Sequence, residues 1–153
     1  KKQKLLTERK QQNNIGVTLM ELIIQEIAEK IIRTSEENLI NMFEEKKDIS
    51  EFIGKTRKML DEIGTDIVSE ALRETDRIVK KDKSRKRDWH VARKADKKSL
   101  ATIFGTVEYE RTYYKNKKTK ECRYLSDDIV GIEPHERMDT MLKAELIENA
   151  IDL

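Results

Sequence analysis

The fold is decided by residues 98–114, which read KSLATIFGTVEYERTYY. β-Branched and aromatic residues dominate its two halves, Leu100–Phe104 and Val107–Tyr114, and such residues favour strands. Gly105-Thr106 stands between the halves, and a two-residue loop with Gly first is typical of a type II′ turn, because glycine adopts positive φ at no steric cost. The stretch therefore predicts a β-hairpin whose second strand shares one face among Val107, Tyr109, Arg111 and Tyr113.

The sequence after the hairpin predicts a loop, a third strand and a helix. Lys115–Glu121 is polar and indicates the loop, and Cys122–Leu125 supplies a short strand in which Cys122 is a small buried side chain. Pro134 favours the first turn of a helix. We expect this helix to run through the end of the sequence and into a further domain, with its apolar positions at Met138, Met141, Leu142, Leu146 and Ile147.

Two long helices are predicted before the hairpin. Thr18 and Glu21 form a capping box, which marks a helix start. Apolar residues then recur at helical spacing as far as Lys47, and Thr34–Glu36 either breaks this helix or lies within it. The apolar positions are Leu19, Leu22, Ile23, Ile27, Ile31, Ile32, Leu39, Ile40, Met42 and Phe43.

The second helix is expected from about Ser50 to about Lys80. Gly54 and Gly64 oppose it, because each costs about 1 kcal/mol relative to Ala in a helix interior. The two helices form either a hairpin within the chain or a pair with another chain. The inward candidates of the second helix are Phe52, Ile53, Leu60, Ile63, Ile67, Val68, Leu72 and Val79.

These elements predict a mainly α protein with a small β-hairpin module (α+β). Long amphipathic helices come first, followed by a two- to three-stranded antiparallel hairpin and a C-terminal helix. The predicted ranges are a basic tail at 1–13, a helical region at 14–80, a basic connector at 81–98, the β-hairpin module at 99–132 and the C-terminal helix at 133–153.

Charge is distributed unevenly along the chain. Charged residues make up 41% of the sequence, whereas roughly 25% is typical of globular proteins. The net charge of +2 divides into +4 for residues 1–13, −6 for 14–79, +7 for 80–98 and −3 for 99–153. A compact basic block is the electrostatic footprint of polyanion binding.

Several classes of protein are disfavoured by the composition. Cys122 is the only cysteine, so no internal disulfide forms and nothing points to an oxidising compartment. No apolar stretch approaches the roughly 18 residues that span a bilayer, and the start of the sequence lacks the pattern of a secretory signal. We therefore expect a cytoplasmic protein without a membrane partner.

The basic block at residues 80–98 is the best candidate for a functional surface. Lysine and arginine neutralise phosphates and release counterions, and Trp89 can stack on a base or wedge into a base step. The alternative is a solvated linker in which Trp89 covers the end of the helix pair. The candidate DNA-binding residues are Lys80, Lys81, Lys83, Arg85, Lys86, Arg87, Trp89, Arg93, Lys94, Lys97 and Lys98.

Catalytic equipment is not apparent in the sequence. It contains no phosphate-binding loop and no nucleophile elbow, and neither His90 nor His135 has a partner at zinc-ligand spacing. Asp127 and Asp128 come nearest to a metal site, but neighbours on a strand point to opposite faces. We expect these two to be loop or helix-capping residues, and we predict no catalytic residue, no metal and no cofactor.

The hairpin region also resembles a known family. Thr102-Ile103-Phe104-Gly105-Thr106-Val107, continued by Arg111 and Tyr114, is similar to the Thr-x-Phe-Gly-x-Val-x-x-x-Arg-x-x-Tyr signature of insertion-sequence transposases of the ISLre type, a group also catalogued as an uncharacterised protein family. The stretch Arg123-Tyr124-Leu125-Ser126-Asp127-Asp128-Ile129-Val130-Gly131-Ile132 resembles the family's following Tyr-x-Leu-Asp-x-x-x-Gly-Leu segment, with Ser126 standing before the Asp pair. The resemblance is specific over about 35 residues.

The resemblance implies a role in transposition. In that family a longer downstream region carries the RNase H-like catalytic domain, so this chain corresponds to an amino-terminal, non-catalytic part that binds double-stranded element-end DNA and assembles as a homo-oligomer. The runner-up function is a helical oligomerisation or protein-interaction module whose basic segment confers solubility. A standalone hydrolase has no supporting constellation of residues.

Overall fold

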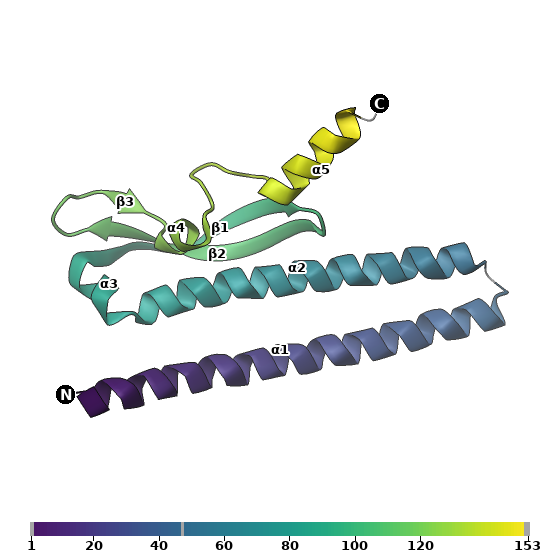
Figure 1. Ribbon diagram of the computed structural model, residues 1–153, viewed down its shortest axis with the longest axis horizontal. Helices are drawn as coiled ribbons and strands as arrows, with labels where there is room; N and C mark the ends of the chain where they lie inside the picture. The colour runs from purple at the N-terminus through teal and green to yellow at the C-terminus, as the bar shows by residue number, and fades with distance from the viewer. Residues whose placement is uncertain (1, 47, 152–153) are drawn as a thin grey trace. The chain divides into compact units, whose positions relative to one another are not determined.

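The structure is a computed structural model that describes the backbone of residues 2–46 and 48–151 and, within these ranges, the side chains from residue 22 onward. It confirms the predicted fold class, with long helices followed by a three-stranded antiparallel sheet and a C-terminal helix (Figure 1). The chain divides into two compact units, Lys1–Met59 and Leu60–Leu153. No helix among the described residues combines the length and the apolar character needed to cross a membrane.

The first unit contains helix α1 (Lys2–Glu44) and the beginning of helix α2 (Ile49–Lys81). Because α1 begins at Lys2, the predicted helix start at Thr18 is wrong. The side chains of Thr18, Leu19 and Glu21 lie outside the described residues. The helix continues without a break through residues 34–36, so the polar residues there lie within it.

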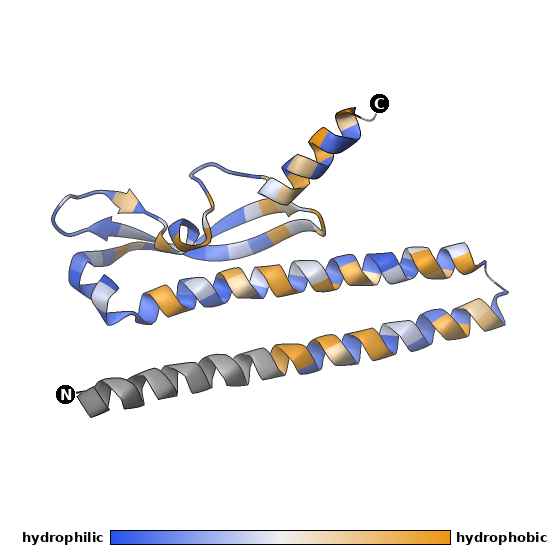
Figure 2. Cartoon of the chain, in the orientation of Figure 1, coloured by the Kyte–Doolittle hydropathy of each residue, from blue (hydrophilic) through white to orange (hydrophobic). Residues whose placement is uncertain are grey.

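The side chains of α1 do not form the single apolar face that the spacing predicts. Asn38 is buried, whereas several of the predicted apolar positions are exposed to solvent. Figure 2 shows the same mixture, with apolar and hydrophilic residues alternating along the described part of the helix. The exposed apolar residues of α1 are Leu22, Ile24, Ile31, Ile32, Leu39, Ile40 and Phe43.

Helix α2 has the predicted bounds to within a residue at each end. Ile63, Leu72 and Val79 are buried as predicted. The prediction is wrong for Ile53, Leu60 and Ile67, which are exposed, and it omits Met59, which is buried. Helical spacing gives the angular position of a residue but not which of two neighbouring apolar stripes meets the rest of the protein.

A short helix and a long strand replace the predicted basic connector. After α2 come helix α3 (Lys83–Asp88), strand β1 (Trp89–Thr102), strand β2 (Gly105–Asn116) and strand β3 (Cys122–Arg123). The sheet order is β1-β2-β3, with all neighbours antiparallel. The pairing of β1 with β2 shifts register between Val91 and Arg93 and again between Arg93 and Asp96, where Ala95 has a φ of 57°.

The hairpin turn lies two residues earlier than predicted. Thr102 pairs with Gly105, so Ile103 and Phe104 occupy the turn. The positive φ predicted for Gly105 is confirmed at 127°, but it belongs to the first residue of β2 and not to a type II′ turn. Thr102 holds the turn, because its Oγ1 accepts from the Phe104 amide at 3.2 Å and donates to the Gly105 carbonyl at 2.8 Å.

Helix α2 packs on the sheet and protects the edge of β2. Leu72 joins Leu100, Val107 and Tyr109 in the core. Ser69 Oγ donates to the Glu108 carbonyl at 2.8 Å, and the Asp76 carboxylate accepts the Thr112 amide at 2.9 Å. These side chains satisfy backbone groups that an unpaired strand edge would leave open. Figure 1 shows α2 running along the hairpin.

The chain ends in two further helices. Helix α4 (Leu125–Val130) terminates at Gly131, whose φ is 73°, and helix α5 (Thr140–Ile151) follows. Pro134 lies in the loop between them, so the predicted helix start is wrong. Asp139 supplies the start, because its carboxylate accepts the Met141 amide at 2.8 Å. The prediction that Cys122 is buried is also wrong, since its thiol is exposed.

Candidate nucleic-acid interface

Basic residues from two separate stretches gather at one end of the sheet. Helix α3 and the loop between β2 and β3 are joined there, because the Lys117 amide donates to the Asp88 carbonyl at 2.9 Å and Lys117 Nζ donates to the Lys86 carbonyl at 2.6 Å. Figure 1 shows α3 and this loop at the same end of the sheet. We call this surface the basic end; its exposed cations are Lys83, Lys86, Arg87, Lys117, Lys118 and Lys120.

Helix α3 is short but firmly capped. The Asp82 carboxylate accepts the amides of Ser84 and Arg85, each at 3.0 Å, and also the Ser84 hydroxyl. The hydrogen bonds from Ser84 lower the pKa of Asp82. This cap satisfies amide groups at the helix start. The lysines and arginines of α3 occupy the turn that follows.

Five of the candidate residues lie on β1, and four of them are at least partly exposed. Trp89 is half-buried and lines a hollow of about 480 Å³ together with apolar side chains of α2 and α4. Arg93 is exposed, but it pairs with Asp96 at 3.0 Å and donates to the Tyr124 hydroxyl at 3.3 Å. Lys94 and Lys97 are exposed, and Lys97 lies opposite Glu110 in the sheet register.

Two candidates have structural roles that remove them from the exposed surface. Arg85 donates to the carbonyls of Val79 at 3.2 Å and Trp89 at 3.4 Å, and its guanidinium lies over the Tyr114 ring. Lys98 is buried. The charge of a residue in sequence does not reveal whether its neighbours enclose it.

The remaining candidates lie near the end of α2 or on α3. Lys80 and Lys81 are the last residues of α2, and Lys80 Nζ lies 2.8 Å from the buried Asp76 carboxylate. Lys83, Lys86 and Arg87 are exposed on α3. The structure therefore brings three of the predicted residues together with three lysines of the β2–β3 loop, which were expected only to form a polar loop. The sequence signal that could have identified these three lysines is the Lys-rich run at residues 115–120.

A second group of charges is buried inside the sheet. Asp127 accepts from the Tyr109 hydroxyl at 3.0 Å, forms an ion pair with Arg111, and lies 3.6 Å from Lys98 Nζ. We call these four residues the Asp127 cluster. Burial raises the pKa of Tyr109 and lowers the pKa of Lys98, since burial favours the neutral form of each group.

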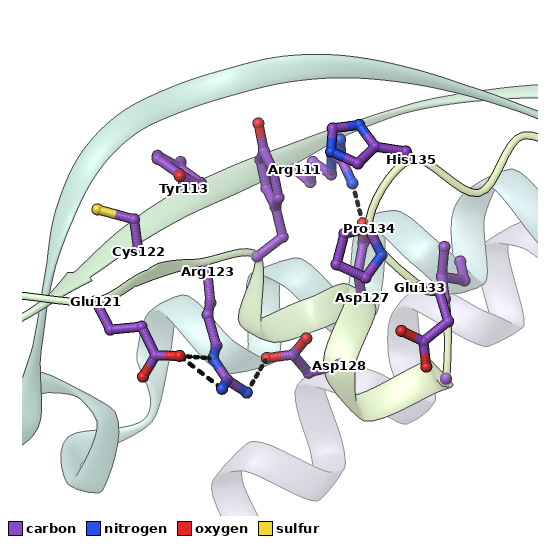
Figure 3. Close-up of a pocket in the computed structure, with 13 residues that line it drawn as sticks. Arg111, Tyr113, Glu121, Cys122, Arg123, Asp127, Asp128, Glu133, Pro134 and His135 are labelled. Atoms are coloured by element: carbon purple, nitrogen blue, oxygen red, sulfur yellow. Dashed lines mark hydrogen bonds and ion pairs between the residues drawn. The ribbon is translucent and has the colours of Figure 1, made fainter.

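A pocket of about 720 Å³ borders this cluster (Figure 3). Five of its charged side chains are paired with each other: Arg123 lies 2.6 Å from Glu121 and 3.7 Å from Asp128, and Asp127 engages Arg111. Asp127 is buried and Asp128 is exposed, and both stand in the first turn of α4 and not on the strand or loop that the sequence predicted. In the described part of the chain, no group of three or more metal-ligating side chains comes together.

The two histidines lie in different surroundings. His90 is exposed near the start of β1, opposite Lys115. His135 lines the pocket beside the Asp127 cluster and has a φ of 66°. The structure therefore does not bring the two histidines into a common pocket.

Comparison with known proteins identifies the family. A family model described as "Uncharacterised protein family (UPF0236)" matches residues 16–153. A UPF0236 protein of Caldanaerobacter subterraneus subsp. tengcongensis, whose name covers eleven loci, is 41% identical over 118 residues, which make up 74% of this chain and 25% of that relative. A second from the same organism, whose name covers four loci, is 43% identical over 105 residues, or 69% of this chain and 22% of the relative.

The match thus covers most of this chain but only a small part of each relative. The chain spans about a quarter of the length of these curated relatives. No solved structure matches it. The family model covers most of the chain, including α2, the sheet and the two helices after it. The chain therefore belongs to UPF0236, an uncharacterised protein family.

Proposed function

We propose that this chain is the DNA-binding and assembly part of a bacterial insertion-sequence transposase of the ISLre type, and that it holds double-stranded element-end DNA in the cytoplasm. The observation that carries the proposal is the basic end, where six exposed cations from two elements share one surface. Such a surface can neutralise several phosphates of one duplex and release their counterions. The signature that resembles these transposases supports the same function.

The relatives add a second line of support. The name of one relative covers eleven loci of a single genome, and the name of another covers four. Many copies of one protein in one genome are expected of a mobile element that duplicates itself. The proposal extends that expectation to this chain through its membership of the same family.

The test is DNA binding by the purified chain across a range of salt concentrations. Wild-type protein should bind a labelled duplex with an affinity that falls steeply as salt rises. Replacing Lys83, Lys86 and Arg87 together by Gln should flatten the log–log salt dependence by about 0.9 for each phosphate that the variant no longer neutralises. Arg85 is left unchanged because its hydrogen bonds stabilise the fold.

The matched control replaces exposed cations away from the basic end. Arg73 pairs with Glu70 on α2, and Lys143 of α5 pairs with Glu136 of the loop before that helix. Changing these two to Gln should leave the salt dependence unaltered. Equal slopes for the wild type and the triple variant would refute the proposed surface.

The proposal gives this chain no bond-cleaving step. Transposases of the type it resembles hold two divalent ions about 3.5–4 Å apart with carboxylates, and Asp127 here is occupied by Tyr109 and Arg111. Supercoiled plasmid incubated with the chain and magnesium or manganese should therefore stay intact. Nicking that disappears in Asp128→Asn would contradict this expectation.

A second candidate function is supported by the helices. Apolar side chains are exposed on α1 at Leu22, Ile32 and Phe43 and on α2 at Ile53 and Leu60. Exposed apolar side chains of this kind favour burial against another protein chain, which fits a helical oligomerisation or protein-interaction module. Light scattering over a wide concentration range distinguishes this function, because a strictly monomeric mass would exclude self-association.

A further inference from the structure

We infer that the β2–β3 loop is the second half of the DNA surface, and that Lys118 and Lys120 contact backbone phosphates of the duplex that α3 contacts. This inference rests on the proposed function and adds a site that sequence separates from the basic block. Lys86 and Lys117 are 31 positions apart, yet the side chain of Lys117 donates to the Lys86 carbonyl. A polyanion that reaches α3 therefore meets the loop as well.

The loop is held in shape before any ligand arrives. Asn116 Oδ1 accepts the amides of Lys118 at 2.9 Å and Thr119 at 3.0 Å, and the Asn116 carbonyl accepts the Lys120 amide at 3.1 Å. The Asn116 amide closes the loop by donating to the Glu121 carbonyl at 2.8 Å. Because the backbone is already ordered, less conformational entropy is lost when its side chains bind.

The neighbouring carboxylates leave the positive charge of the loop lysines in place, although Asp88 offsets the charge of Arg87. Asp82 is occupied as the cap of α3, and Glu121 lies 2.6 Å from Arg123. Asp88 lies 3.6 Å from Arg87, at the rim between α3 and the loop. Lys120 Nζ donates to the Lys117 carbonyl at 2.8 Å, an acceptor that leaves its charge in place. The lysines of the loop thus face solvent with their positive charge available to a polyanion.

The chemistry of the loop selects phosphate over base edges. Lysine ammonium groups act as point charges that suit phosphate oxygens, whereas base reading relies on bidentate arginine, asparagine or glutamine contacts in a groove. Trp89, the nearest aromatic candidate for base stacking, is half-buried in its own hollow. The loop should therefore add affinity that is independent of DNA sequence.

The decisive experiment measures DNA binding by the variant Lys118→Gln/Lys120→Gln on two duplexes of unrelated sequence. We expect the log–log salt slope to fall by about 0.9 for each phosphate left unneutralised, equally on both duplexes. The variant Lys118→Arg/Lys120→Arg keeps the charge and should keep the wild-type slope. The matched control is Arg73→Gln/Lys143→Gln, which removes the same charge elsewhere and should change nothing.

The outcomes separate this inference from the function on which it rests. If the loop variant keeps the wild-type slope while the α3 triple variant has a flatter one, the loop is not part of the surface and the proposed function stands. If the wild type itself shows no salt-dependent binding, both fail. A weaker affinity on only one of the two duplexes would overturn the assignment to backbone phosphates. Circular dichroism and thermal melting confirm that each variant is folded before binding is compared.

Discussion

The residues of the hairpin signature and the residues that form the basic end behave in opposite ways. Among the signature residues, Val107 and Tyr114 are almost wholly enclosed and Arg111 reaches the buried Asp127, whereas Phe104 is partly exposed. The cations of the basic end point outward into solvent. The most recognisable part of the sequence thus builds the fold, whereas the surface proposed to bind DNA is built from lysines and arginines that carry little pattern.

The signature can be explained residue by residue as architecture. Thr102 holds the turn through its hydroxyl, and the Phe104 ring packs so closely on Gly64 that a Cβ there would lie 2.5 Å from Phe104 Cγ. Gly105 takes the positive φ after the turn. Family resemblance therefore reports the sheet and its packing on α2, and it reports function only indirectly.

The largest expected effect tests whether Asp127 is structural. Asp127→Ala would leave Arg111 and Lys98 buried without their anion, and removing one partner of a buried pair costs about 3–5 kcal/mol. Asp128→Ala is the control, because Asp128 is exposed and lies 3.7 Å from an exposed arginine; such pairs contribute about 1 kcal/mol or less. Urea unfolding measures both. Similar losses of stability in the two variants would show that the buried cluster does not hold the sheet and α4 together.

A smaller effect is expected where Gly64 meets Phe104. Gly64→Ala places a methyl group 2.5 Å from Phe104 Cγ, and overpacking of this kind costs about 1–3 kcal/mol. Gly54→Ala is the matched change in the same helix, where no atom lies within 4 Å of the added Cβ. That variant should gain about 0.5–1 kcal/mol from the lower flexibility of alanine. Melting temperatures that shift in the same direction for both would contradict the packing of Phe104 on Gly64.

The sequence predicted the helices and strands better than the burial and contacts of their side chains. The bounds of α2 and the existence of the hairpin follow from local spacing and β propensity. The start of β1 at Trp89 was missed because Lys, Arg and Asp fill its first half, and strand propensity is weak where packing and register decide. Arg85 and Lys98 belong to the basic block by sequence but to the interior by packing, and the partner that encloses Lys98 lies on α4, far along the chain.

The β2–β3 loop is a second case in which the sequence did not reveal the surroundings of a residue. Lys117, Lys118 and Lys120 belong to a region whose net charge is negative, so segment charges conceal them. Only the antiparallel return of β2 carries them back to α3, where Lys117 donates to a carbonyl of that helix. A surface assembled from distant segments depends on strand register, which the sequence did not predict.

Lys98 belongs to the basic block by sequence and to the Asp127 cluster in the structure. Its replacement is expected to have the smallest effect on the free energy of unfolding at neutral pH. Lys98 Nζ is buried and has no hydrogen-bond acceptor among the described residues. Lys98→Met keeps the length of the side chain and leaves Arg111 paired with Asp127. Because replacing a buried charge by an apolar side chain is often neutral or stabilising, the free energy of unfolding at pH 7 should stay within about 1 kcal/mol of the wild-type value or exceed it.

The pH dependence of that variant distinguishes a buried Lys98 from an exposed one. Burial lowers the pKa of Lys98 below its ordinary value of 10.5, so the folded state binds fewer protons than the unfolded state between the two values. The free energy of unfolding attributable to Lys98 therefore rises as pH increases through that window, and the penalty of its charge is fully present below it. Wild type and Lys98→Met share every other titratable group, so the difference between their urea-unfolding free energies isolates Lys98. That difference should move in favour of the wild type between neutral pH and pH 10.5. A difference that stays constant across this range would place Lys98 on the surface, with the exposed lysines of the basic block.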